Sequence, residues 1–131
     1  EAAFRYQFEK VGSALHKNAT VYFLAVRDPE SNELADPSDA LLARFKTHVP
    51  RVTKASDAMA AADEPARDRK SGERGLVFEL ADIRWIEDDA VDIDGGYYDA
   101  GTSASTHTYF LIKQHGEWVV KQDIKPPRLP E

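Results

Sequence analysis

The aromatic and histidine residues between positions 97 and 118 have the side chains best suited to chemistry. Period-two spacing places His107 on the same strand face as Tyr109, and Trp118 follows on the next predicted strand. A histidine beside a carboxylate can act as a general base. We predict a ligand-binding group made of Tyr97, Tyr98, His107, Tyr109 and Trp118. A hydrogen-bonded structural histidine is the more common finding, so no residue is assigned as catalytic.

Two glycines precede the tyrosine pair in the run Gly95-Gly96-Tyr97-Tyr98. Glycines in a strand let the backbone approach a ligand closely, and they also mark β-bulges that bend a sheet. Because adjacent strand residues point to opposite faces, at most one of the two tyrosines can line a given pocket. We interpret the run mainly as a bulge that bends the sheet and so creates a concavity.

Acidic residues cluster between positions 87 and 99, and Asp92-Ile93-Asp94-Gly95 resembles part of a calcium loop. The third early carboxylate and the bidentate glutamate at loop position 12 are missing. Alternate carboxylates also suit the outward side of a strand, where charge deters edge pairing. The chain has no cysteine, its histidines are scattered, and it carries no phosphate loop or nucleophile elbow. We therefore predict neither a metal site nor a cofactor.

Two helices are expected to support these residues. Apolar residues at i, i+4, i+7 and i+11 predict a helix from Phe4 to Leu15. A second helix is predicted to begin at Asp36, which would cap it, with Pro37 at the first helical position. Between them, residues 20–26 have the near-continuous apolarity of a strand buried on both faces.

Strand patterns dominate the rest of the chain. A modest strand is predicted over 51–58, and a mobile loop over 60–74. The main strands are predicted at 76–80, 83–86, 91–94, 108–112 and 118–120, with turns at 87–89 and 114–117.

Helix, strand, helix and then an antiparallel meander is an α+β order. We predict a single domain over residues 1–125, in which a curved antiparallel β-sheet of about four to six strands packs on one or two helices. Residues 126–131 are rich in proline, which predicts an extended or disordered tail.

The order of elements resembles the NTF2-like superfamily and the related cystatin-like layout. That resemblance implies a cavity in which enzymes of the superfamily use Asp or His bases and Tyr donors.

Several short runs are similar to a family of small, uncharacterised bacterial proteins. The runs are DPSD at 36–39 with LARF at 42–45, SGERGLVF at 71–78, GGYY at 95–98 with SAS at 103–105, and GEWVV at 116–120. The resemblance implies a bacterial origin and a recurring domain. It brings no activity and no catalytic residues with it.

Composition narrows the choice of partners. The 131 residues are 42% hydrophobic and 31% charged, which is ordinary for a globular protein. The formal net charge of −6 argues against nucleic-acid binding, which needs a basic surface. No apolar run approaches the roughly 20 residues that span a bilayer. Because the chain begins at Glu1 rather than Met, we expect a segment upstream; export after removal of a signal and a cytoplasmic location both stay open.

The leading functional prediction is a non-catalytic binding module, for a protein partner or for a small apolar ligand in the sheet concavity. One alternative is an isomerase or hydrolyase-like enzyme of NTF2-like type, with His107 and Tyr97 or Tyr98 as acid and base. Another is an acidic immunity or inhibitor protein that docks a basic toxin, which the negative charge favours. A homodimer through the sheet face is also predicted.

Overall fold

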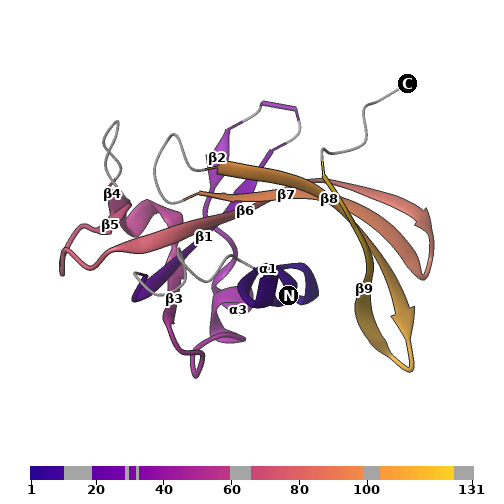
Figure 1. Ribbon diagram of the computed structural model, residues 1–131, viewed down its shortest axis with the longest axis horizontal. Helices are drawn as coiled ribbons and strands as arrows, with labels where there is room; N and C mark the ends of the chain where they lie inside the picture. Colours follow the sequence, from indigo (N-terminus) through magenta and orange to yellow (C-terminus); the bar gives the residue numbers. More distant parts are fainter. Residues whose placement is uncertain (11–18, 29, 32, 60–65, 99–103, 126–131) are drawn as a thin grey trace.

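The computed structural model shows an α+β fold built on one curved, mixed β-sheet of seven strands (Figure 1). It describes residues 1–10, 19–28, 30–31, 33–59, 66–98 and 104–125. The strands of the sheet are β1 (Val21–Arg27), β2 (Leu34–Ala35), β3 (Arg51–Lys54), β6 (Gly75–Glu87), β7 (Ala90–Tyr98), β8 (Ala104–Gln114) and β9 (Glu117–Ile124). A separate small sheet pairs β4 (Ala58–Met59) with β5 (Arg67–Asp68). The predicted α+β class and the curved sheet are confirmed.

Strand β1 lies inside the sheet and explains why the sheet is mixed. The strand order is β2-β1-β6-β7-β8-β9, and β3 also pairs with β1. Strands β6 to β9 form the predicted antiparallel meander, whereas β1 runs parallel to both β3 and β6. The side chains from Val21 to Ala25 are fully buried, which confirms the strand predicted to be covered on both faces.

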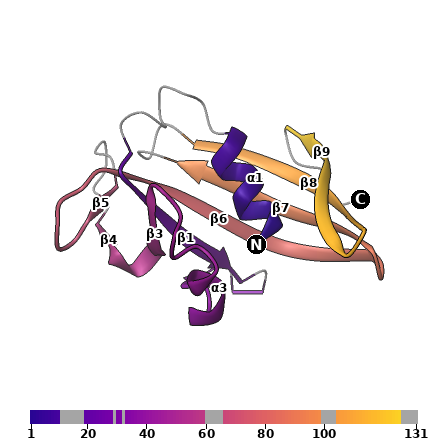
Figure 2. The same cartoon turned by 90° about the horizontal axis from the view of Figure 1, so that it is seen from below.

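Helix α1 (Ala2–Lys10) lies in the concavity of the sheet, as the two views show (Figures 1 and 2). Its buried residues include Phe4 and Phe8, as the helical spacing predicts. The Phe8 ring packs at centroid distances of 5.0 Å from Tyr22 and 4.9 Å from Phe78. The helix therefore joins β1 to β6 through aromatic contacts. The predicted continuation as far as Leu15 lies outside the described residues.

The second helix, α3 (Asp39–Ala43), begins later than predicted. Ser38 is its N-cap, because the Ser38 Oγ accepts a hydrogen bond from the Leu41 N–H at 3.1 Å. Asp36 was the wrong choice of cap, since its carboxylate instead accepts two hydrogen bonds from Ser56, at 2.9 and 2.7 Å. Pro37 consequently precedes the cap rather than opening the helix. Leu41 and Leu42 are half-buried against the core, as expected.

The bend in the sheet is not where the glycines predict it. Gly95 and Gly96 pair with β6 and with β8 without a shift in register, so the predicted bulge at this point is wrong. The irregularity lies on β6, where Asp82 takes a φ of 32° and the register shifts between Ala81 and Ile83. Strand β6 is thus one long, kinked strand in place of the two predicted at 76–80 and 83–86.

Gly95 is required by close packing. A Cβ atom there would lie 2.9 Å from a methyl carbon of Leu80 and 2.9 Å from a ring carbon of Tyr109. Only glycine lets these two side chains meet over the strand.

The predicted hairpin turns are confirmed. Residues 88–89 form a turn, and so do His115 and Gly116, with φ angles of 54° and 80°. The strand predicted over 51–58 is divided into β3, a short 3-10 turn (Ala55–Asp57) and the start of β4. In the predicted loop, residues 66–74 contain β5; residues 60–65 and the predicted tail at 126–131 lie outside the described residues.

Candidate ligand-binding cavity

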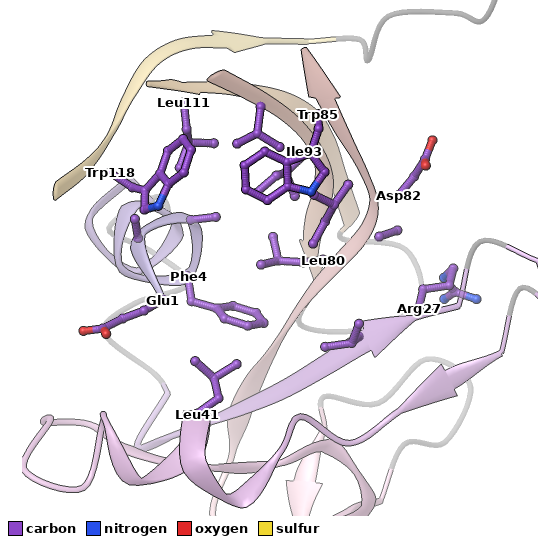
Figure 3. Close-up of a pocket in the computed structure, with 16 residues that line it drawn as sticks. Glu1, Phe4, Arg27, Leu41, Leu80, Asp82, Trp85, Ile93, Leu111 and Trp118 are labelled. Atoms are coloured by element: carbon purple, nitrogen blue, oxygen red, sulfur yellow. The ribbon is translucent and has the colours of Figure 1, made fainter. Parts of the chain in front are cut away.

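An apolar cavity of about 480 Å³ lies between α1, α3 and the concave face of the sheet (Figure 3). Its larger apolar lining residues are Phe4, Leu41, Leu80, Ile83, Trp85, Ile93, Leu111 and Trp118. The wall thus draws on helix α1, helix α3 and all four strands of the meander. Nothing in the sequence patterns had grouped these residues.

The kink at Asp82 is what turns β6 side chains into this cavity. Before the kink, even-numbered residues such as Leu80 face the core. Because the extra residue reverses the alternation, Ile83 and Trp85 then face inward, opposite Ile93 and Val91 of β7. Without the kink, the two large apolar side chains would project from the outer face of the sheet.

Two indole rings form one end of the wall. Trp85 of β6 and Trp118 of β9 meet edge to face, with centroids 5.6 Å apart and ring planes at 70° (Figure 3). Trp85 nevertheless leaves 64% of its surface exposed, and Ile83 leaves 53%. Large exposed apolar side chains that line a concave surface are typical of a binding site.

Every charged side chain in the described wall already has an oppositely charged neighbour. The pairs are Glu1 with Arg5 and Arg44, Arg27 with Glu79, and Asp82 with Arg84. Hydrogen bonds from Arg5 and Arg44 lower the pKa of Glu1, so its carboxylate stays ionised. Each charged side chain of the described wall therefore already has at least one ionic partner.

Three of the predicted residues, Tyr97, His107 and Tyr109, form a second cluster that does not contribute to the described wall of the cavity. The His107 ring stacks on Tyr97 and Tyr109, with centroid distances of 5.8 and 5.6 Å. Its Nδ1 is hydrogen-bonded to Asp123 at 2.5 Å, and the Tyr6 hydroxyl donates to the other carboxylate oxygen of Asp123 at 3.1 Å. The predicted shared face of His107 and Tyr109 is confirmed. Asp123 as the partner of His107 was not predicted.

The structure thus divides the five predicted ligand-binding residues. Trp118 lines the cavity, whereas Tyr97, His107 and Tyr109 are not among its described lining residues. Tyr98 pairs through its backbone with β6 and β8, and its side chain lies outside what the structure describes.

Gln7 belongs to this second cluster and was not predicted. It is 1% exposed, and its Nε2 donates hydrogen bonds to the Gly96 carbonyl at 3.1 Å and the Tyr109 hydroxyl at 3.2 Å. Burial raises the pKa of Tyr109 well above its usual value, so the phenol stays protonated. The burial of Gln7 could have been predicted from its position, because it is three residues after Phe4 and directly before Phe8, on the buried side of α1.

The carboxylates that resemble a calcium loop face the other side of the sheet. Asp94 accepts two hydrogen bonds from the Arg84 guanidinium, both at 2.8 Å, and one from Thr108, also at 2.8 Å. Burial opposes the charged form of Asp94, but these hydrogen bonds outweigh it and lower its pKa. Among the described residues, no three His, Asp or Glu side chains are placed to hold a metal ion.

None of the helices that the structure describes is long and apolar enough to cross a membrane. Comparisons with known protein families, with curated proteins and with solved structures find no match to this chain.

Proposed function

We propose that this protein binds a small, uncharged, apolar ligand in the cavity between α1, α3 and the sheet. The observation that carries the proposal is the exposed apolar wall, in which Trp85 and Ile83 are more than half exposed inside a concave surface. The volume of about 480 Å³ suits one small molecule, since ligand pockets measure roughly 300–1,000 Å³. A ligand there would remove indole and aliphatic surface from water, which favours binding.

The charge pairs in the wall support a neutral ligand. A charged group would have to displace an existing partner or be buried without one, and both are costly. An apolar ligand avoids that cost because Glu1, Arg27 and Asp82 keep their own partners.

We favour ligand binding without catalysis as the function of this site. The His107–Asp123 pair is the arrangement that acid–base chemistry would use, but neither residue belongs to the described wall of the cavity.

The curved sheet around α1 supports an NTF2-like or cystatin-like layout. The relationship to the family of small bacterial proteins is proposed from the sequence runs alone. The homodimer through the sheet face stays a prediction.

Titration with the neutral dye N-phenyl-1-naphthylamine, which fluoresces in apolar surroundings, tests the proposal. Leu41→Trp places a larger side chain in the wall, and Leu34→Trp is the matched control because Leu34 is exposed and is not a lining residue. We expect saturable binding to the unmodified protein and to Leu34→Trp, and affinity at least about tenfold weaker in Leu41→Trp. The absence of saturable binding, or equal binding by all three proteins, would overturn the proposal.

A further inference from the structure

The indole N–H groups of Trp85 and Trp118 are hydrogen-bond donors in an otherwise apolar cavity, and they are available to a ligand. A tryptophan N–H is a donor only, and it usually finds an acceptor when it is buried. Neither Trp85 nor Trp118 donates a hydrogen bond to any residue in the part of the chain that the structure describes. In the open cavity both donors can hydrogen-bond to solvent, whereas a bound ligand that displaces the solvent has to supply the acceptor itself.

The orientation of the rings favours a flat ligand. The indole planes stand at 70° to each other, so they form a corner rather than a closed stack. Figure 3 shows the rings at one end of the cavity, with the nitrogen of each on the ring edge nearer to Phe4 and Leu80. The Phe4 ring is itself part of the wall. An aromatic ligand ring can pack its face against one indole and its edge against the other, and aromatic pairs prefer these stacked and edge-to-face arrangements.

We propose that the ligand combines a planar ring with a carbonyl or ether oxygen that accepts a hydrogen bond from one of the indoles. The inference rests on the proposed function and narrows it to a chemical class. A hydrocarbon of the same shape would bury the donor without an acceptor, which weakens binding. A flexible alkyl chain would satisfy the donor only if it carried an oxygen, and it would lose more conformational freedom on binding.

Three neutral probes separate the ring from the acceptor. They are 2-acetylnaphthalene with both features, 2-ethylnaphthalene with the ring only, and 2-undecanone with the acceptor only. Because the chain has two tryptophans, nitrogen-15-labelled protein should give two indole signals that follow each titration. We expect 2-acetylnaphthalene to bind about fivefold or more tighter than either other probe. It should also move one indole proton downfield, whereas 2-ethylnaphthalene should not.

Trp85→Phe and Trp118→Phe keep a ring and remove one N–H each. We expect one of the two variants to lose the preference for 2-acetylnaphthalene while it still binds 2-ethylnaphthalene, which also shows that its cavity is intact. Equal affinity for all three probes, or a preference that survives in both variants, would overturn the ring-and-acceptor class and leave the proposed function standing. Failure of every probe to bind the unmodified protein would overturn the proposed function itself.

Discussion

Trp85 and Trp118 bring their ring centroids within 5.6 Å of each other, although strands β7 and β8 lie between the strands that carry them. In a flat sheet, three steps of about 4.8 Å would separate β6 from β9 by about 14 Å. The contact therefore requires the two side chains to converge over a concave surface. The same curvature covers Val91 and Leu111 and forms the end of the cavity.

Trp85→Ala should weaken binding of N-phenyl-1-naphthylamine by about tenfold, because the ligand loses an aromatic contact surface. The free energy of unfolding should change little, since the Trp85 side chain is mostly exposed. Dye titration and urea unfolding measure the two effects. The adjacent Ile86 is the control, because it is 54% exposed but is not a lining residue. Equal loss of affinity in Ile86→Ala would show that the cavity wall is not the binding surface.

Gly95→Ala should destabilise the protein by about 1–3 kcal/mol, the usual cost of overpacking a core. The new methyl group would lie 2.9 Å from both Leu80 and Tyr109, and 3.0 Å from the Glu79 carbonyl oxygen. Urea unfolding measures the change. Thr106→Ala, at an exposed position of the next strand, should stay within about 0.5 kcal/mol of the unmodified protein. An unchanged midpoint for Gly95→Ala would mean that the strand has room for a side chain.

Strand alternation predicted which side chains share a face, but it could not predict where they lie along the sheet. His107 and Trp118 both face inward, as expected. Trp118, however, pairs opposite Lys113, which is six residues along β8 from His107. At about 3.4 Å per residue, that spacing is roughly 20 Å. The predicted group therefore combined the His107 cluster with a residue of the cavity wall that lies much farther along the sheet.

The cavity itself depends on a feature that local sequence does not reveal. Residues with a positive φ are usually glycines. The bulge was therefore predicted at the glycine pair 95–96, which lies on the wrong strand. The kink occurs instead at Asp82. Aspartate tolerates a positive φ, but an aspartate in the sequence does not by itself predict one. Only the pairing of β6 with β7 shows that Ile83 and Trp85 have changed face.

Asp94→Asn should reduce stability by about 1 kcal/mol near neutral pH, because it removes the charge that Arg84 pairs with at a partly exposed site. The pKa of Asp94 is lowered in the folded protein, so its contribution is complete above the unfolded value of about 3.9. It is lost as the pH falls through the folded pKa. Urea unfolding at several pH values should show the two proteins converging below about pH 4. Asp88→Asn, in an exposed turn, is the control, and a difference that did not depend on pH would contradict the expectation.

His107→Gln should destabilise the protein but leave the affinity for N-phenyl-1-naphthylamine unchanged. The substitution removes a side chain that is bonded to Asp123 and stacked between two tyrosine rings, so a loss of about 1–3 kcal/mol is expected. Asp123→Asn should have a similar effect, and the double variant should cost less than the sum because the two residues share one interaction. Urea unfolding gives the coupling, and dye titration of each variant while it is still folded gives the affinity. A large loss of affinity with stability retained would place His107 in the ligand site and favour the enzyme alternative over simple binding.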